Sequence, residues 1–248
     1  MKTVEFGKQN NDVIMLLHGG GLSWWNYKAE AELLKDQYHV VLPILDGHAG
    51  SDNDFISIEK NASRLISFVD KKFGGSVLLI GGLSLGAQIL VEMLTQQNTI
   101  CQNAVIESAS VIPSKLTNAL IKPMFSLSYG LVKKKCFAQM QFDYLHIRKD
   151  LFEDYYRDTS QISKENMIAF MEANTSYEIK PGLQNAHTKV RILVGEKEQK
   201  KMICSAEQLH KVLPGSVLEI KKGLYHGEYS INCPERYTKE LLDMINAQ

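Results

Sequence analysis

The sequence has no excess of either charge and little that points to a metal or a disulfide. Lys plus Arg and Asp plus Glu both number 28, so the formal net charge is zero. A nucleic-acid groove needs a basic excess, so no nucleic-acid partner is predicted. The four cysteines form no C-x-x-C pair, and none has a nearby histidine at zinc-ligand spacing. We therefore expect reduced thiols and no metal site.

Long apolar runs are also missing. The N-terminus, Met1 to Phe6, lacks the apolar stretch of a signal peptide. The most apolar long stretch, Val77 to Val91, is too short and too interrupted by glycine to span a membrane. These features predict a cytoplasmic protein without a membrane span, and they leave its oligomeric state open. The densest charge run, Lys133-Lys134-Lys135, is interpreted as a solvated helix face.

What is present is an alternation of short apolar runs and longer amphipathic segments along 248 residues, enough for one large α/β domain. Continuous apolar runs of this length are typical of parallel strands buried on both faces. They predict strands at Val13 to Leu17, Tyr38 to Leu45, Val77 to Ile80, Ala104 to Ile106, Val190 to Val194 and Val217 to Ile220. The segments between them predict helices at Ala29 to Asp36, Ser57 to Phe73, Leu85 to Gln96, Ser205 to Leu213 and Pro234 to Ile245. This pattern predicts an α/β fold with a mostly parallel sheet flanked by helices.

One long segment breaks the alternation. From about Pro113 to Tyr177 the pattern is helical throughout, and this segment carries much of the aromatic content. It is either a helical hairpin that packs on the sheet or a helical cap that lies over an active site. Its position between two predicted strands favours the cap. The predicted organisation is a core of residues 1–112 and 178–248 with a cap at residues 113–177.

The run Gly82-Leu83-Ser84-Leu85-Gly86 is a G-x-S-x-G motif between a predicted buried strand and a predicted helix. A serine at such a sharp strand-to-helix turn has a strained backbone and presents its hydroxyl at the carboxyl ends of the strands. Gly82 and Gly86 leave room for the turn. Ser84 is therefore predicted to be a nucleophile.

A serine hydroxyl reacts well only when a base removes its proton. Of the seven histidines, His226 lies in a loop between the last predicted strand and the last predicted helix. That loop leaves the same edge of the sheet as Ser84. We therefore predict that His226 is the general base.

A histidine base needs an acid that orients its ring, and two glutamates follow the strand that ends at Val194. We prefer Glu198, because the first residues after the strand still belong to the turn. Glu196 is the second candidate, and Glu107, which follows a weaker strand, is the third.

The glycine run His18-Gly19-Gly20-Gly21 follows the first buried strand. Consecutive glycines leave backbone N–H groups free to face an oxyanion, and the N–H groups of Gly20 and Leu85 are the predicted donors. The sequence contains neither G-x-G-x-x-G nor G-x-x-x-x-G-K-[ST], so no nucleotide cofactor is predicted. His18 is interpreted as a structural hydrogen-bonding residue.

Along essentially its whole length the chain resembles the α/β-hydrolase superfamily, which has the same order of serine, acid and histidine. His18 to Gly21 looks like its oxyanion loop, and Asp46 to Ser51 looks like its D-x-x-G-H-G-x-S turn, shortened and with an inserted alanine. Gly195 to Glu198 looks like its G-x-x-D turn with Glu in place of Asp, and Tyr225-His226 looks like its G-H turn. The resemblance implies an α/β-hydrolase fold with a helical cap and a two-step acyl transfer through an acyl-enzyme.

Several functions remain open within this fold. The first is hydrolysis of a small carboxylic ester, a thioester or a monoacyl lipid, with a Ser-His-Glu triad and no cofactor. The second is cleavage of a carbon–carbon or amide bond by the same residues, and the third is a non-catalytic ligand sensor. Trp24 and Trp25 either pack under the oxyanion loop or, with Gly21, line the acyl pocket. The aromatic segment favours a substrate with an apolar acyl or alkyl group.

Overall fold

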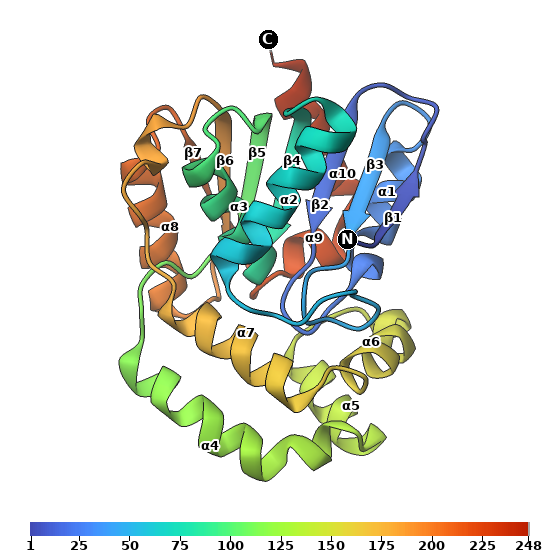
Figure 1. Cartoon of the computed structure of the whole chain (residues 1–248), viewed down its shortest axis with the longest axis vertical. Coiled ribbons are helices and arrows are strands. Elements are labelled where there is room, and N and C mark those ends of the chain that lie inside the picture. The colour runs from blue at the N-terminus through green and yellow to red at the C-terminus, as the bar shows by residue number, and fades with distance from the viewer. Residues whose placement is uncertain (248) are drawn as a thin grey trace.

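Seven strands form one sheet in the computed structural model, which describes residues 1–247 (Figure 1). Their order across the sheet is β1-β3-β2-β4-β5-β6-β7. Only β1 is antiparallel to its neighbour. The strands are β1 (Thr3–Phe6), β2 (Val13–Leu17), β3 (His39–Pro43), β4 (Val77–Leu83), β5 (Cys101–Glu107), β6 (Lys189–Gly195) and β7 (Val217–Lys221). The mostly parallel sheet and all six predicted strands are confirmed.

The apolar runs predicted parallel strands correctly because both faces of the sheet are covered. In β2, Val13, Met15 and Leu17 pack into one hydrophobic cluster, whereas Ile14 and Leu16 pack into the other. Every residue of β2 is buried. The edge strand β1 was not predicted, since its four residues are only half-buried and carry no continuous apolar run.

Helices cover both faces of the sheet. They are α1 (Lys28–Leu34), α2 (Ile58–Phe73), α3 (Leu85–Gln96), α8 (Lys200–Val212), α9 (Glu228–Asn232) and α10 (Pro234–Asn246). Apolar residues of α2, α3 and α8 belong to one cluster, and those of α1 and α10 belong to the other. No helix within residues 1–247 is long and apolar enough to cross a membrane.

Helix ends follow local signals where these exist. Ser57 caps α2 by accepting a hydrogen bond from the N–H of Lys60, and Gly74, in the left-handed region with φ of 70°, ends it. The helix predicted from Ser205 begins instead at Lys200. That start was misplaced because Gln199, which precedes it, offers no side-chain cap and the first turn is charged. The short helix α9 was missed.

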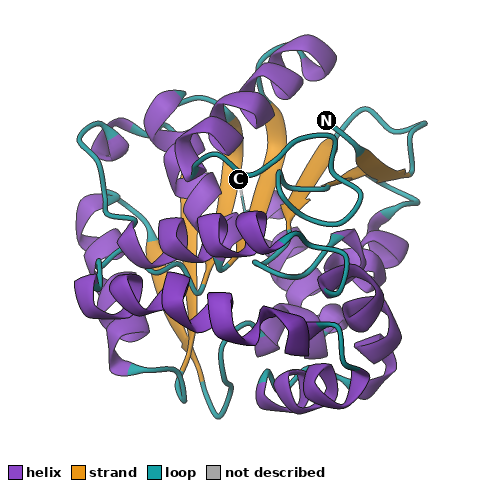
Figure 2. Cartoon of the chain, turned by 60° about the horizontal axis from the view of Figure 1, so that its bottom comes forward, coloured by secondary structure: helices purple, strands orange, loops and turns teal. Residues whose placement is uncertain are grey.

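Residues 113–177 contain four α-helices and no strand, and they connect β5 to β6. Figure 1 shows them as a separate layer beyond one end of the sheet, and in Figure 2, where that end comes forward, helices lie in front of the strands. Hydrogen bonds to loops after β2 and β3 hold the layer in place: Thr159 donates to Gly21 O, and Asn166 accepts from the N–H of Phe55. The helices are α4 (Lys115–Val132), α5 (Lys135–Tyr144), α6 (Phe152–Thr159) and α7 (Lys164–Ser176).

A carboxyl group in the core makes the stability of the fold depend on pH. Glu30 of α1 is 1% exposed, and burial raises its pKa to about 8. A carboxyl with a raised pKa stabilises the fold below its unfolded pKa, and that contribution is lost as the pH rises through the folded value. We expect the free energy of unfolding to fall by about 4 kcal/mol between pH 5 and pH 9 from this group, at 1.36 kcal/mol per pKa unit.

Urea unfolding across this pH range measures the effect. Glu30→Gln should remove the part of the pH dependence that Glu30 contributes, whereas Glu32→Gln, at an exposed position of the same helix, should follow the wild-type curve. Parallel curves for wild type and Glu30→Gln would contradict the assignment.

Candidate active site

Ser84 lies directly after β4, in the turn that leads into α3, as predicted. Its backbone has φ of 53° and ψ of −112°, a strained conformation for a residue with a side chain. A Cβ at Gly82 would lie 2.6 Å from Gly86 O, and a Cβ at Gly86 would lie 2.2 Å from Leu17 O. Both positions therefore require glycine for the chain to pack this closely.

His226 approaches Ser84 from the loop between β7 and α9. Its Nε2 lies 3.0 Å from the Oγ of Ser84. The loop packs tightly on the turn after β6, where a Cβ at Gly195 would lie 2.4 Å from Leu224 O. Two segments 142 residues apart in sequence thus meet at hydrogen-bond distance.

Glu198 lies on the other side of the imidazole. Its Oε2 is 2.6 Å from Nδ1 of His226, and its Oε1 accepts hydrogen bonds from Ser108 Oγ and the N–H of Gly195, both at 2.7 Å. Burial raises the pKa of this carboxyl, but the hydrogen bond and charge of His226 and the other two donors outweigh burial and leave the pKa below its ordinary value. Glu198 is therefore ionised at neutral pH.

The other two candidate acids lie elsewhere. Glu196 is exposed and accepts a hydrogen bond from the N–H of Gly223 at 2.8 Å. Glu107 is 2% exposed and accepts a hydrogen bond from the N–H of Ser230 at 3.2 Å, and burial raises its pKa to about 7. Of the three glutamates, the structure brings Glu198 to His226.

Ser108 contributes to this site and was not singled out in the sequence. It follows β5 with φ of 56°, in the left-handed region that residues other than glycine seldom adopt. Its hydroxyl donates a hydrogen bond to Oε1 of Glu198, while Oε2 of Glu198 bonds to His226. The one available signal was its position directly after a buried strand, at the edge where the other site residues also lie.

The glycine loop after β2 lies beside the start of α3. A Cβ at Gly20 would be 3.6 Å from the Cβ of Leu85, so the two predicted oxyanion donors are neighbours. Leu85 is the first residue of α3, and its N–H has no partner within the helix. The N–H of Gly21 is already used, because it donates to Nε2 of His48 at 3.1 Å.

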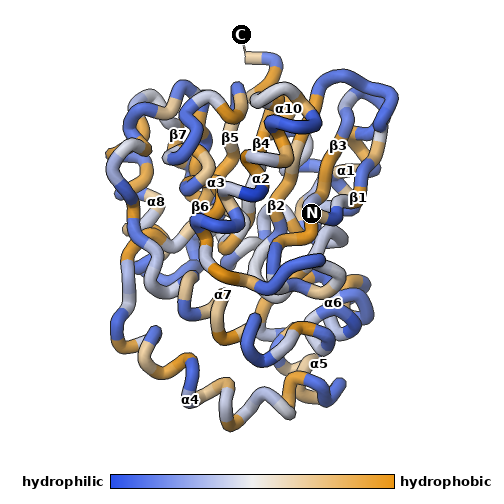
Figure 3. The backbone as a smooth tube through the Cα atoms, in the orientation of Figure 1, coloured by the Kyte–Doolittle hydropathy of each residue, from blue (hydrophilic) through white to orange (hydrophobic). Residues whose placement is uncertain are grey.

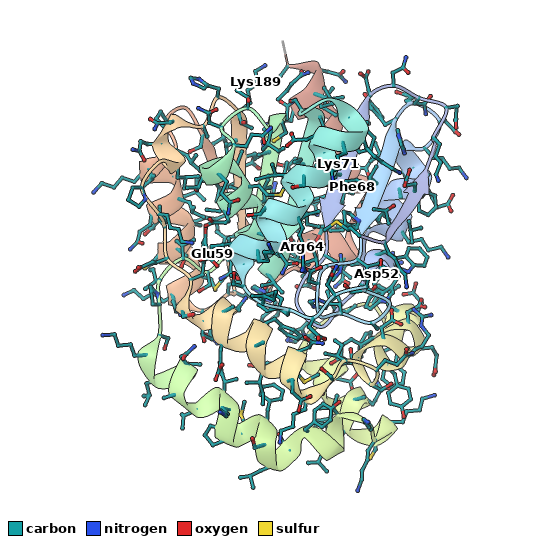
Figure 4. The ribbon with its side chains drawn as sticks, in the orientation of Figure 1. Asp52, Glu59, Arg64, Phe68, Lys71 and Lys189 are labelled. Atoms are coloured by element: carbon teal, nitrogen blue, oxygen red, sulfur yellow. The ribbon has the colours of Figure 1, made fainter. Side chains whose placement is uncertain are left out.

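Two buried histidines support this loop. Burial lowers the pKa of His48 to about 4, so its ring is neutral and can accept from Gly21. The turn that contains His48 is held by an ion pair between Asp46 and Arg64, which Figure 4 labels on α2. His18 is fully buried, contacts Gly19 O through Nδ1 and accepts from the N–H of Leu45, which is a structural role as predicted.

Three cavities meet around the site. One of about 60 Å³ is lined by Ser84 and His226, and one of about 410 Å³ by Glu198 and His226. A third, of about 560 Å³, lies between the glycine loop and the helices of residues 113–177, with mainly aromatic and methionine side chains. Leu145, directly after α5, lines all three, so the cavities adjoin one another at this residue.

For the tryptophans the sequence left two interpretations open, packing under the glycine loop or lining the acyl pocket. Trp25 is 1% exposed and donates to a carboxylate oxygen of Asp158 in α6 at 2.8 Å. Neither Trp24 nor Trp25 lines any of the three cavities, whereas Gly21 lines the largest. Trp25 is therefore a core side chain that bonds to the helical layer.

The arrangement can move a proton from a hydroxyl to an imidazole that a carboxylate orients. Such a hydroxyl can attack an electrophilic carbon beside two main-chain N–H groups. Residues 1–247 contain no cluster of three or more side chains that could hold a metal ion.

Comparison with known proteins assigns the chain to a family. A model of the alpha/beta hydrolase family matches residues 14–199. The fold is similar to an esterase from Exiguobacterium antarcticum, at 16% identity over 99% of this chain and 95% of the other, with a TM-score of 0.82. It is equally similar to an enol-lactonase from Burkholderia xenovorans LB400, at 14% identity over 98% and 95% of the two chains, with a TM-score of 0.82.

A thermophilic esterase from Thermogutta terrifontis is also similar, at 16% identity over 98% of this chain and 91% of the other, with a TM-score of 0.79. No curated protein sequence matches the chain significantly. At these identities the solved structures support the fold. The family model covers most of the chain, from β2 through Glu198, and on that match the chain belongs to the alpha/beta hydrolase family.

Proposed function

We propose that this chain is a serine hydrolase that cleaves carboxylic esters with an apolar acyl group. One observation carries the proposal: an unbroken series of contacts from Ser84 Oγ to His226 at 3.0 Å and from His226 to Glu198 at 2.6 Å. The series has the geometry that activates a serine hydroxyl. The names of the similar structures, two esterases and an enol-lactonase, agree with cleavage of an ester bond.

The first half-reaction requires the tautomer of His226 that carries its proton on Nδ1. The carboxylate of Glu198 accepts a hydrogen bond from the N–H at Nδ1, which leaves Nε2 unprotonated and able to take the proton of Ser84. Ser84 Oγ then bonds to the ester carbonyl carbon, and the carbonyl oxygen becomes an oxyanion. The N–H groups of Gly20 and Leu85 and the positive end of the α3 dipole stabilise that charge.

Collapse of this intermediate breaks the bond to the alcohol oxygen, which takes the proton from Nε2 of His226. The acyl group remains on Ser84. In the second half-reaction His226 removes a proton from water, the hydroxide attacks the acyl carbon, and the proton returns to Ser84 as the carboxylic acid leaves. Atoms balance as ester plus water giving acid plus alcohol.

The cavity of about 560 Å³ is the proposed acyl site. Its walls are apolar, with Phe125 from α4, Phe137 from α5, and Met167 and Phe170 from α7. It adjoins the nucleophile through Gly20, which also lines the small cavity with Ser84. Because a cavity of about 150 Å³ holds a benzene ring, this one has room for an acyl chain of more than six carbons. The helices of residues 113–177 thus act as a cap over the site.

Substrate class is the test of this proposal. Chromogenic esters from acetate to laurate are compared with a vinylogous diketone, for carbon–carbon cleavage, and with an aminoacyl anilide, for amide cleavage. We expect kcat/KM to be highest for a medium-chain ester. Preference for the diketone or the anilide would replace the ester proposal with the corresponding activity, and no turnover of any substrate would favour a ligand sensor.

A substitution in the cavity checks which wall meets the acyl chain. Met171→Trp adds bulk to a lining position of α7. We expect kcat/KM for laurate to fall at least about tenfold relative to acetate, because a few displaced methylenes are worth that factor. Leu33→Trp, at a half-exposed position of α1, should leave the ratio unchanged. Equal losses on both esters would refute this acyl site.

A further inference from the structure

Helix α4 forms the outer edge of the cap (Figure 1) and carries a row of exposed large apolar side chains. The five members are four, four, three and four residues apart, a spacing that places them on one face of a helix. They are Leu116 at 76% exposure, Leu120 at 56%, Met124 at 53%, Leu127 at 90% and Leu131 at 39%. We call this row the outer stripe.

The outer stripe is separate from the face by which α4 packs on the protein. Ile121 and Val132 are buried, and Phe125 and Val132 line the acyl cavity. The hydropathy colouring in Figure 3 shows apolar positions recurring along α4. A water-exposed helix ordinarily has one apolar stripe, toward the core. A second, uncovered stripe is typical of a surface that binds something.

The segment that carries the outer stripe has charges of one sign only. Residues 113–142 contain five lysines and no aspartate or glutamate. Among the ion pairs within residues 1–247, only Lys135 of the five is engaged, with Glu153 of α6. The run Lys133-Lys134-Lys135 follows the last turn of α4, and Lys115 begins the helix. Cationic side chains therefore lie at both ends of the outer stripe.

We propose that α4 docks this chain onto an anionic lipid surface. The outer stripe would enter the boundary between headgroups and acyl chains, and the long lysine stems would reach from the helix to the phosphates. A second copy of the chain is a poorer occupant, because it would present the same lysines and no carboxylate between residues 113 and 142 to pair with them. The docking requires no catalytic residue, so it stands apart from the proposed hydrolysis.

Vesicle flotation of the full chain tests the proposal. Vesicles of phosphatidylcholine alone are compared with vesicles that also contain phosphatidylglycerol, at low and high salt. We expect at least tenfold stronger partition onto the anionic vesicles at low salt, and weaker partition at high salt as the charges are screened. Leu120→Gln with Leu127→Gln should lower the partition at least tenfold, and Lys133→Glu with Lys134→Glu should do the same.

Matched controls use exposed positions outside the cap. Leu33→Gln with Ile56→Gln removes two exposed apolar side chains, and Lys28→Glu with Lys71→Glu makes the same change of net charge. Both should bind anionic vesicles as wild type does. Circular dichroism and turnover of a water-soluble acetate ester show that each variant is folded.

Three outcomes would overturn the proposal. The first is that wild type fails to bind anionic vesicles, and the second is that the Leu120 and Leu127 double variant binds them as well as wild type. The third is a dimer in light scattering that this double variant converts to a monomer while vesicles bind neither form, which would make a second copy the occupant.

Discussion

Replacing Ser84 with alanine is expected to lower kcat/KM for an ester by roughly 10⁴- to 10⁶-fold. The substitution removes the one oxygen that lies 3.0 Å from Nε2 of His226, so no acyl-enzyme can form. The remaining turnover would come from binding and the oxyanion donors. Steady-state kinetics on the preferred ester measures the loss, and a fluorophosphonate probe should label wild type and not Ser84→Ala.

His226→Ala is the companion variant. Because the hydroxyl and its base act as a unit, losing the base should cost about as much as losing the nucleophile, and the double variant should be no worse than either single variant. Neither substitution should weaken the fold, since Ser84 and His226 contribute no buried apolar side chain. A His226→Ala enzyme that retains most of its activity would refute the assignment.

Glu198→Gln is expected to lower kcat by roughly 10³- to 10⁴-fold. The oxygen Oε1 already accepts from Ser108 and Gly195, so the new amide would place its NH₂ against Nδ1 of His226. An NH₂ group there favours the tautomer that carries its proton on Nε2. That ring cannot accept the proton of Ser84, although every side chain would keep its position.

The other two glutamates provide matched controls for this second prediction. Glu196→Gln changes an exposed carboxylate and should leave kcat close to wild type. Glu107→Gln replaces a buried carboxyl whose pKa is raised to about 7, so near pH 6 the amide resembles the protonated acid and activity should change little. If Glu196→Gln lowered kcat strongly and Glu198→Gln did not, the assignment of Glu198 as the acid would be wrong.

The pH dependence of kcat distinguishes the role of Glu198 from that of Glu107. The pKa of Glu198 lies below its ordinary value, so its charge persists as the pH falls below the range in which a free glutamate is protonated. Glu107 changes charge near neutral pH. Loss of kcat on acidification is therefore expected to be the same in wild type and Glu107→Gln, and kinetics from pH 5 to pH 8 compares them.

Local sequence signals were enough to predict the elements that position the nucleophile. The apolar run of β4, the two glycines around Ser84 and the amphipathic start of α3 are neighbours in sequence, and each restricts the backbone over a few residues. The strands β2 and β6 were predicted equally well, because a strand buried on both faces must be apolar almost throughout. The edge strand β1 and the uncapped start of α8 lacked such signals.

The sequence by itself determined the α/β pattern, the strained turn that presents Ser84, and the loops from which a histidine and an acid would come. Only the tertiary structure decided that Glu198 rather than Glu196 or Glu107 reaches His226, that Ser108 holds its second oxygen, and that Trp25 packs in the core. The physical reason is the range of the interactions: turns and helices depend on residues a few positions apart. Contacts across 28 to 142 residues depend on how the finished sheet and its loops pack.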